Sequence, residues 1–294
     1  MSNFLELQSP AKLNLFLHII GRRSDGYHLL QSVFQFIDWC DTIRLRLIPE
    51  NTIRRIHPLP SVPVEQDLVV RAAQLLKDTY HVKLGVEIAL DKNIPMGAGL
   101  GGGSSNAATV LIGLNHLWQL KLDLNTLCKL GLQLGADVPF FLFGQNAFVE
   151  GIGEKLQPID LESQDFLVIF PGKSIATAGI FQNPQLTRNH APITIDGLFA
   201  SPLSYAGNPF GNDCESVALQ ICPEVKQALA WIEANLPGSA PRMSGSGSSV
   251  FAVLDRDQTP AALERNLQNL PSGWVGRIVR GLNKNPAYNL ISSE

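Results

Sequence analysis

The sequence predicts an α+β protein of two domains, and three observations carry that prediction. Its 294 residues are more than one compact core usually organises. Strand-like and helix-like segments mix without the strict βαβα alternation of a doubly wound parallel sheet. A boundary between residues 150 and 165 would leave two parts of similar size. We therefore expect one domain at residues 1–160 and a second at residues 161–294.

Apolar periodicity predicts the elements of the first domain. Alternation indicates strands, and a helical spacing of apolar residues indicates helices. Asp67 stands where a helix start favours an acidic residue, and Gly21–His28 contains a Ser-Asp-Gly turn signal. The expected strands are residues 11–20, Ser32–Ile37, Thr42–Ile48, Val86–Leu90 and Phe148–Lys155, and the expected helices are Gln66–Thr79, Ser105–Trp118 and Asn125–Leu134.

The second domain has a similar mixture of elements. Residues 171–212 are rich in Pro, Asn, Gly and Ser, so we expect mostly irregular structure there. A cluster of glycine and serine at Ser244–Ser249 precedes an apolar strand. The expected strands are Phe166–Phe170, Val250–Leu254 and Trp274–Leu282, and the expected helices are Asp213–Leu236 and Thr259–Leu270.

Composition indicates a globular protein and argues against several classes of function. Hydrophobic residues make up 45% of the chain and charged residues 17%, a balance typical of folded domains. A net charge of −3, with arginines scattered in pairs, predicts no nucleic-acid partner. No apolar run approaches the roughly 20 residues that span a bilayer, and the N-terminus lacks signal-peptide and transit-peptide features. We expect a complete, cytoplasmic chain without membrane contact, with its four cysteines as free thiols.

The strongest local signal is a glycine-rich run between a predicted strand and a predicted helix. From Gly97 to Gly103 every residue is glycine except Ala98 and Leu100. Glycine can adopt positive φ and lets the backbone approach a ligand closely. Successive backbone N–H groups form a concave oxyanion site, and the following helix adds a positive dipole end. Phosphate is therefore the expected ligand. The predicted phosphate-binding residues are Pro95, Met96, Gly97, Ala98, Gly99, Leu100, Gly101, Gly102, Gly103, Ser104 and Ser105.

Three other interpretations of this run fit less well. A flexible linker has no need to join a strand to a helix, and ordering so many glycines carries a large entropic cost. A Walker A loop requires a lysine after the glycines, and the Gly-Lys-Ser at Gly172–Ser174 lacks the required first glycine. Gly97, Gly99 and Gly102 match the dinucleotide fingerprint, but that fingerprint directly follows a strand, whereas Asp91–Met96 intervene here.

Two groups of polar residues stand out in apolar surroundings. Lys12 and Asn14 lie on one face of the first predicted strand, which by itself is also the pattern of a solvent-facing edge strand. Asp137, within Gly135–Pro139, is either a helix N-cap or a carboxylate at the edge of an active site, opposite Lys12. In the second case it could accept the proton of an attacking hydroxyl, a role that contributes roughly 10²–10⁴-fold.

The glycine and serine cluster at Ser244–Ser249 has two interpretations. It does not match the G-x-S-x-G turn of hydrolases, because residue 247 is glycine. It is either an ordinary turn or a small-residue loop that packs against the first glycine run and leaves room for a phosphate chain.

The motifs Ser9–Leu15, Pro95–Ser105 and Ser244–Ser249 resemble, in order and spacing, the three motifs of the GHMP kinase superfamily. The similarity extends to Gly21–His28 and Gly135–Pro139, covers nearly the whole chain and is strongest before residue 155. Within the superfamily, these motifs are similar to those of kinases acting on a cytidine diphosphate conjugate of methylerythritol in non-mevalonate isoprenoid biosynthesis. Several motifs in the same order are far more specific than any single one.

The resemblance implies a two-domain GHMP kinase fold with a ferredoxin-like second domain. It implies ATP and Mg²⁺ as cofactors and transfer of the γ-phosphoryl group to the 2-hydroxyl of the methylerythritol part. The matching positions imply Asp137 as the base, Lys12 as the group that orients and polarises, and Pro95–Ser105 as the site for the ATP phosphates. The implied substrate-binding residues are Asn14, Tyr27, His28, Thr177 and Phe181, with Tyr27 and His28 holding the cytidine.

Two competing functions remain open. Another GHMP kinase, acting on an amino acid, a sugar or a mevalonate-type alcohol, would have no use for the Tyr27-His28 turn. A non-catalytic nucleotide-binding protein would bind ATP without turnover, although the presence of both Lys12 and Asp137 argues against it. The sequence assigns no magnesium ligands beyond the candidates Ser105 and Asp137, and we expect a monomer or a homodimer.

Overall fold

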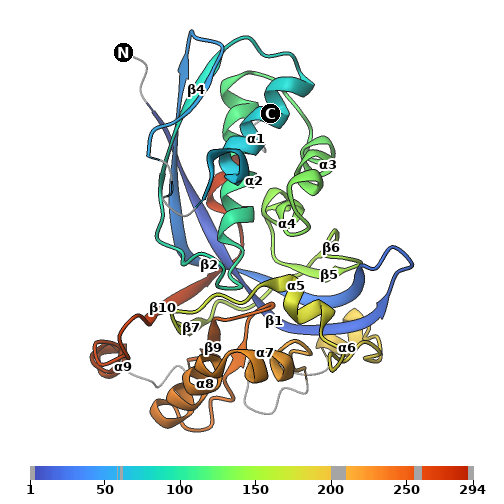
Figure 1. Cartoon of the computed structure of the whole chain (residues 1–294), viewed down its shortest axis with the longest axis vertical. Helices are drawn as coiled ribbons and strands as arrows, with labels where there is room; N and C mark the ends of the chain where they lie inside the picture. The colour runs from blue at the N-terminus through green and yellow to red at the C-terminus, as the bar shows by residue number, and fades with distance from the viewer. Residues whose placement is uncertain (1–3, 58, 60–61, 200–209, 255–259, 291–294) are drawn as a thin grey trace.

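A long antiparallel hairpin connects the two halves of the molecule. The computed structural model describes residues 4–57, 59, 62–199, 210–254 and 260–290. Strands β1 (Leu5–Arg22) and β2 (His28–Ile48) run through the middle of the molecule (Figure 1). Most elements of the first half of the chain gather around one end of this hairpin, and those of the second half lie at the other end.

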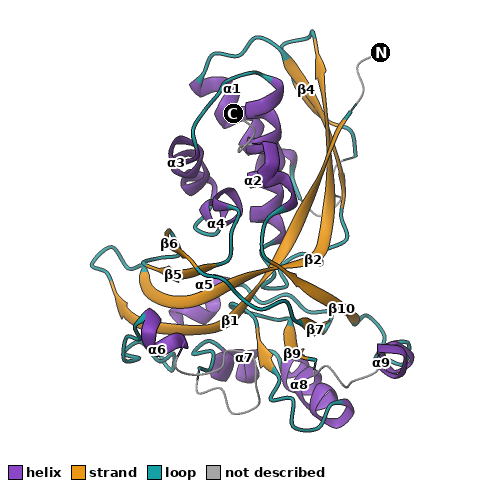
Figure 2. Ribbon diagram, turned by 180° about the vertical axis from the view of Figure 1, so that it is seen from behind, coloured by secondary structure: helices purple, strands orange, loops and turns teal. Residues whose placement is uncertain are grey.

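The first half is a sheet covered on one face by helices (Figure 2). A single apolar core cluster joins the helices to the sheet and includes Phe34, Phe36, Phe140 and Phe141. The other strands here are β3 (Ile53–Arg55), β4 (Gly85–Asp91), β5 (Ala147–Glu150) and β6 (Lys155–Pro158). The helices are α1 (Leu68–Thr79), α2 (Gly102–Leu117), α3 (Leu124–Leu134) and α4 (Val138–Phe143), with a 3₁₀ turn at Val64–Gln66.

The second half contains an antiparallel sheet with the strand order β10-β7-β9-β8. The strands are β7 (Asp165–Phe170), β8 (Arg242–Met243), β9 (Val250–Val253) and β10 (Val275–Leu282). The helices are α5 (Thr177–Gln182), α6 (Ile195–Phe199), α7 (Glu215–Ile221), α8 (Pro223–Asn235) and α9 (Pro260–Leu267), and a 3₁₀ turn follows at Pro286–Leu290. With helices between β7 and β8 and between β9 and β10, this is the βαββαβ order of a ferredoxin-like unit, as the resemblance implied.

Local sequence signals located several elements correctly. Helix α1 begins one residue after Asp67, whose carboxylate accepts a hydrogen bond from the Val69 N–H, as expected of an N-cap. The predicted helix at Asn125–Leu134 corresponds to α3, and the predicted strand at Phe166–Phe170 corresponds to β7.

Three expected segments are divided differently in the structure. The strand expected at Phe148–Lys155 is two strands, β5 and β6, joined by a turn in which Gly151 and Gly153 have positive φ. The expected strands Ser32–Ile37 and Thr42–Ile48 belong to one continuous strand, β2. The polar segment between them stays in the sheet because the buried Asp41 carboxylate accepts hydrogen bonds from the backbone N–H groups of Asn93 and Ile94. The single helix expected at Asp213–Leu236 is broken between α7 and α8, since Pro223 lacks the N–H that a continuing helix would need.

The division at residue 160 stays a prediction. The chain passes from β6 to β7 near that point, but the two halves also share structure. Gly281 of β10 pairs with Ile37 of β2, and one apolar cluster contains Phe16 of β1 together with Phe166 of β7. The β1–β2 hairpin thus contributes to the core at both ends of the molecule.

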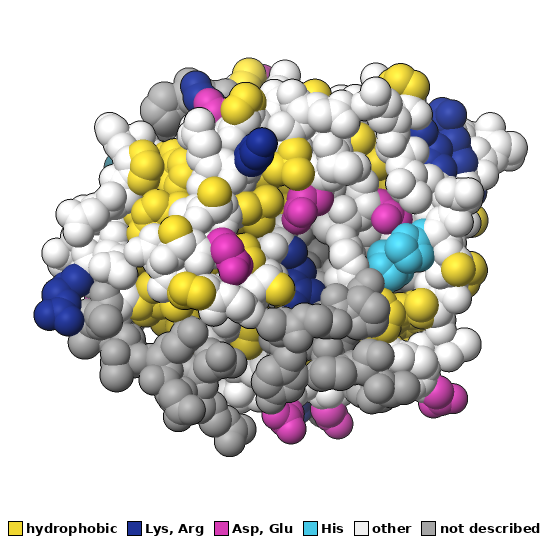
Figure 3. Space-filling model, turned by 90° about the horizontal axis from the view of Figure 1, so that it is seen from below, with side chains coloured by type: hydrophobic (Ala, Val, Ile, Leu, Met, Phe, Trp, Pro, Cys, Tyr) yellow, Lys and Arg dark blue, Asp and Glu magenta, His cyan; other side chains and the backbone are white. Residues whose placement is uncertain are grey.

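Helix lengths and surface charge bear on binding to membranes and to polyanions. None of the helices in the described part of the chain has both the length and the apolar character needed to cross a membrane. On the face in Figure 3, the lysine and arginine side chains of the described residues lie in separate small groups rather than in one stripe. A polyanion would need such a stripe to bind along this face.

Candidate active site

The glycine-rich run connects β4 to α2 and has the backbone geometry of an anion site. Gly97, Gly99 and Gly101 have φ values of 63°, 77° and 71°, in the left-handed region that glycine adopts without strain. Gly101 is the N-cap of α2 and offers no side chain to cap it. The first N–H groups of α2 are therefore not satisfied by a side-chain cap, and the positive end of the helix dipole lies at the loop.

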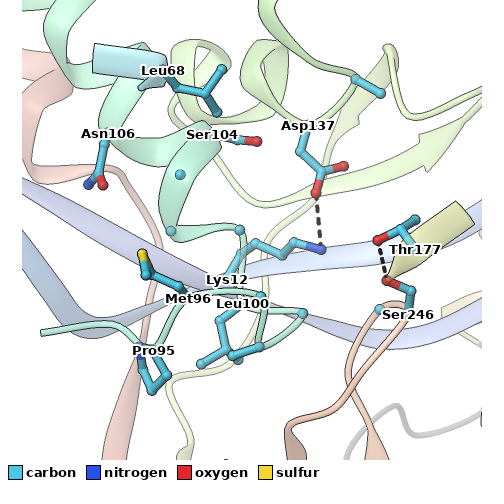
Figure 4. A pocket seen from close by; sticks show the side chains of 18 of the residues that line it. Lys12, Leu68, Pro95, Met96, Leu100, Ser104, Asn106, Asp137, Thr177 and Ser246 are labelled. Atoms are coloured by element: carbon cyan, nitrogen blue, oxygen red, sulfur yellow. Dashed lines mark hydrogen bonds and ion pairs between the residues drawn. The ribbon is translucent and has the colours of Figure 1, made fainter. Parts of the chain in front are cut away.

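This loop borders a cavity of about 510 Å³ (Figure 4), a size typical of small-molecule sites. Every residue from Pro95 to Ser104 contributes to the lining. Ser105, predicted with them, does not. Its side chain is fully buried, and its hydroxyl is hydrogen-bonded to the Ser9 hydroxyl at 2.8 Å. Its backbone N–H donates to the Gly101 carbonyl within the helix, so Ser105 supports α2 rather than facing the cavity.

Lys12 and Asp137 both line this cavity, and their side chains point toward each other (Figure 4). Lys12 Nζ lies 3.5 Å from Asp137 Oδ2, and the lysine side chain is 4% exposed while that of Asp137 is 34% exposed. Lys12 Nζ also donates to Asn14 Oδ1 and lies 4.4 Å from the centre of the Phe34 ring. The interpretation of Lys12 and Asn14 as a solvent-facing edge is wrong, because both are buried.

Asp137 occupies a helix start without capping it. It is the residue before α4, but its side chain makes no capping hydrogen bond. Pro139 lies in the first turn of α4, and a proline has no N–H to be satisfied there. The carboxylate is left free to point toward Lys12. Both interpretations of the sequence thus hold in part, since the position is that of an N-cap and the side chain belongs to the cavity.

The cluster at Ser244–Ser249 packs directly on the glycine-rich run. The Ser249 N–H donates to the Ala98 carbonyl at 3.0 Å, and the Ser244 hydroxyl donates to the Gly99 carbonyl at 3.3 Å. The same hydroxyl accepts from the Asn14 N–H at 3.1 Å. The predicted packing of two small-residue loops is confirmed, and β1 joins them at the same point.

Two predicted residues, Thr177 and Phe181, line the cavity from α5. The Thr177 hydroxyl lies 2.9 Å from the hydroxyl of Ser246, which also lines the cavity (Figure 4). The start of α5 is thereby connected to the third motif. Figure 4 draws Thr177 on the same side of the cavity as the end of the Lys12 side chain, whereas the Phe181 ring contacts that of His28 at the start of β2.

Neither Tyr27 nor His28 is part of the cavity lining, and His28 adjoins that lining through Phe181. The His28 and Phe181 rings have centroids 5.1 Å apart and are tilted by 35°, so Phe181 joins His28 to the cavity lining. His28 is buried, whereas Tyr27 is 59% exposed. Burial lowers the pKa of His28, and the neighbouring Arg188 and Arg22 charges lower it further. An exposed aromatic ring next to a buried, neutral imidazole could hold a flat ligand.

The donor set at the cavity fits a magnesium ion held mainly by phosphate and water. Among the described residues, no group of three or more His, Cys, Asp or Glu side chains gathers at a potential metal site. Magnesium in phosphoryl-transfer sites commonly takes only one or two protein ligands. Ser104 and Asp137 line the cavity and are drawn on the same side of it in Figure 4. Ser105, an earlier candidate ligand, is directed to Ser9 instead.

Sequence reasoning missed several residues of the site. Lys92 lines the cavity next to the loop and pairs with Asp41. Its position just before the glycine run is the sequence feature that could have identified it as a residue of the site. Leu68 and Asn106 also line the cavity. Leu68 comes from the start of α1, about 30 residues before the loop, and nothing in its local pattern distinguishes it from a core residue.

The fold and the site together define a small-molecule kinase of the GHMP class. Family models described as "GHMP kinases N terminal domain" and "GHMP kinases C terminal" match residues 67–145 and 197–272. The 4-diphosphocytidyl-2-C-methyl-D-erythritol kinase of Polynucleobacter asymbioticus is 70% identical over 99% of this chain and 97% of its own length. The chain belongs to the 4-diphosphocytidyl-2-C-methyl-D-erythritol kinase family.

Solved structures agree with this assignment. A crystal structure of a 4-(cytidine 5'-diphospho)-2C-methyl-D-erythritol kinase has a TM-score of 0.77 at 31% identity and covers 94% of this chain and 99% of that one. The mevalonate kinase of Methanococcus jannaschii has a TM-score of 0.69 at 15% identity, with coverages of 96% and 99%, which shows the shared fold alone. The predicted GHMP kinase fold is confirmed. The protein is a kinase of non-mevalonate isoprenoid biosynthesis that uses ATP to phosphorylate an alcohol.

Proposed function

We propose that this kinase transfers the γ-phosphoryl group of ATP to the 2-hydroxyl of 4-diphosphocytidyl-2-C-methyl-D-erythritol. One structural observation carries the proposal. The Lys12–Asp137 pair and the glycine-rich loop border one cavity, and the His28–Phe181 ring pair adjoins that cavity. A phosphate site, a carboxylate and an aromatic site are therefore adjacent, in the combination that a nucleotide-linked alcohol requires.

In the proposed reaction the protein mainly aligns the alcohol with the γ-phosphoryl group and stabilises the charge of the phosphates. The alcohol oxygen attacks the γ-phosphorus while Asp137 accepts the hydroxyl proton and ADP departs. Lys12, held by Asn14 and Asp137, places a positive charge beside the transferred group. The N–H groups of the loop and of the start of α2 bind the phosphate chain.

Magnesium is proposed on chemical grounds. When bound, it would offset the negative charge of the phosphates during transfer. Ser104 and Asp137 would hold it, because they offer oxygen ligands on the cavity lining. The remaining ligands would be phosphate oxygens and water, as is usual for this ion.

The cytidine is proposed to bind at the aromatic end of the cavity. Tyr27 and Phe181 would offer ring faces for stacking, and His28, whose ring contacts that of Phe181, would offer a directed polar group. Thr177 and Asn14 would contact the part of the substrate between the base and the reacting hydroxyl, since both line the cavity there.

Coupled ADP release tests this function. The protein is assayed with Mg-ATP and the cytidyl substrate, beside mevalonate, homoserine and galactose at equal concentrations. We expect turnover with the cytidyl substrate alone. Turnover with another alcohol in its place would overturn the substrate assignment, and ATP binding without turnover on any of them would support the non-catalytic alternative.

A further inference from the structure

Arg188 is fixed in one position and donates a hydrogen bond to His28. It lies on a segment that we call the strap, residues 183–193, which follows α5. Its Nε donates to His28 Nε2 at 3.0 Å. Its terminal nitrogens donate to three backbone carbonyls, those of Leu186 at 3.0 Å, Phe181 at 3.1 Å and Asn183 at 2.7 Å. The guanidinium group therefore has little freedom to move away from the imidazole.

The strap itself is fastened to the β1–β2 hairpin. The His190 N–H donates to the Ile19 carbonyl at 3.0 Å, and the Ile193 N–H donates to Gln31 Oε1 at 2.8 Å. The His190 ring stacks on the buried His18 ring with centroids 3.5 Å apart. These contacts lie on the C-terminal side of Arg188, and α5 lies on its N-terminal side. Arg188 is thus anchored in both chain directions.

This contact determines the tautomer of His28. A guanidinium group has only donors and stays charged, so His28 Nε2 must be the acceptor and carry no proton. In the neutral ring the proton is then on Nδ1. Among the described residues, none forms a hydrogen bond with Nδ1, and this atom is left to serve a ligand. Burial and the charges of Arg188 on the strap and Arg22 on β1 lower the pKa of His28, which favours the neutral ring.

We infer that Arg188 is a positioning residue that holds His28 in the Nδ1–H tautomer, so that the imidazole presents an N–H donor to an acceptor atom of the substrate's pyrimidine base. The inference rests on the proposed function, because it takes His28 as part of the base site. Cytosine offers O2 and N3 as acceptors. The opposite tautomer would set the Nδ1 lone pair against them, and that arrangement repels rather than binds.

The test is the pH dependence of the variant Arg188→Met, which removes every donor but keeps most of the apolar stem. At pH 8 we expect KM for the cytidyl substrate to rise about 2- to 10-fold, the range of one net hydrogen bond, with kcat and KM for ATP unchanged. As the pH is lowered through the pKa of His28, which the loss of the Arg188 charge raises in this variant, protonation puts a hydrogen on both ring nitrogens and restores the Nδ1 donor. The ratio of variant to wild-type KM should therefore fall toward 1 as the pH falls.

A loss that is equal at every pH would mean that Arg188 only supports the strap, and it would overturn the inference. Coupling gives a second readout. In a His28→Ala background, Arg188→Met should change KM by less than about 2-fold, because no imidazole remains to be oriented. Independent, additive losses would again point to a merely structural role. Arg22→Met is the matched control, since it removes the other nearby cation without touching Nε2.

The ¹⁵N spectrum of His28 separates this inference from the proposed function. At pH 8 the wild-type protein should give the Nδ1–H tautomer, and Arg188→Met should shift the population toward Nε2–H, whereas Arg22→Met should not. This result does not depend on any substrate. If the cytidyl alcohol is not phosphorylated, the proposed function fails alone. If it is phosphorylated but the wild-type ring carries its proton on Nε2, only the inference about Arg188 fails.

Discussion

The two ends of the cavity are built in different ways. The end that we propose to bind phosphate, the phosphate end, is made mostly of backbone from one short segment, Gly97 to Gly103, where three glycines have positive φ. The end that we propose to bind the base, the base end, is made of side chains from distant parts of the chain, namely His28 of β2, Phe181 of α5 and Arg188 of the strap. A change of backbone shape should therefore damage the first end, whereas a change of a single side-chain group should damage the second.

Between the two ends lies the reacting pair, and its carboxylate should give the largest effect. Asp137→Asn keeps the size of the side chain but removes its ability to accept a proton. We expect kcat to fall at least about 10²-fold while ATP affinity is retained, measured by coupled ADP release and by ATP titration. The exposed Glu162→Gln serves as a control that removes a carboxylate elsewhere. Near-normal turnover of the Asp137 variant would remove this residue from the base role.

The variant Gly99→Ala tests the phosphate end. An added Cβ would lie 2.5 Å from the Ser244 carbonyl oxygen and 2.8 Å from that of Gly247, at a φ of 77°. Strain of this kind costs on the order of 1–3 kcal/mol, so KM for ATP should rise at least about 10-fold. Gly103→Ala is the matched control, because its Cβ would have Leu68 Cδ1 at 3.4 Å as its nearest neighbour and its φ is ordinary. Equal effects of the two variants would contradict the account of the loop.

The variant Tyr27→Ala tests the base end. Stacking of a base on an aromatic ring contributes about 1–3 kcal/mol by alanine substitution, so KM for the cytidyl substrate should rise about 10-fold. The kcat and KM for ATP should stay within about 2-fold, because Tyr27 lies outside the phosphate end. Its thermal unfolding should also be unchanged, since the ring is 59% exposed. A rise in KM for ATP as large as the rise in KM for the cytidyl substrate would contradict the assignment of Tyr27 to the base end.

The fastening of the strap should have the smallest effect on catalysis and a visible effect on acid stability. Burial, together with the nearby His190, lowers the pKa of His18 to about 4, although Asp213 opposes the shift. Within the described part of the chain, neither ring nitrogen of His18 has a hydrogen-bond partner. The unfolded chain, with a pKa near 6.5, therefore takes up this proton first. The free energy of unfolding should fall as the pH drops from about 6.5 toward 4.

His18→Phe should remove this dependence, because phenylalanine keeps a ring to stack on His190 and has no proton to gain. Relative to wild type, the variant should become more stable by roughly 2 kcal/mol between pH 7 and pH 4.5, measured by urea unfolding at each pH. At pH 8 its kcat and KM should match wild type within about 2-fold. A stability difference that does not change with pH would show that His18 is not the group that takes up the proton.

Prediction from sequence succeeded where a short segment determines its own structure. The Asp67 cap and the helix at Asn125–Leu134 follow from local residue chemistry. It failed where tertiary contacts override local signals. The apolar pattern predicted two strands, Ser32–Ile37 and Thr42–Ile48, but hydrogen bonds from Asn93 and Ile94 to the buried Asp41 help to keep β2 continuous.

The sequence by itself determined the class of this protein, because several motifs occur in the same order, and it predicted the phosphate end, because a run of glycines before a helix favours an oxyanion site. The tertiary structure decided which polar groups meet. It turned Ser105 inward to Ser9, brought Asp137 from the start of α4 to Lys12 and set Arg188 against His28 across 160 residues of chain. A side chain's partner depends on how distant strands and helices pack, and no local pattern carries that information.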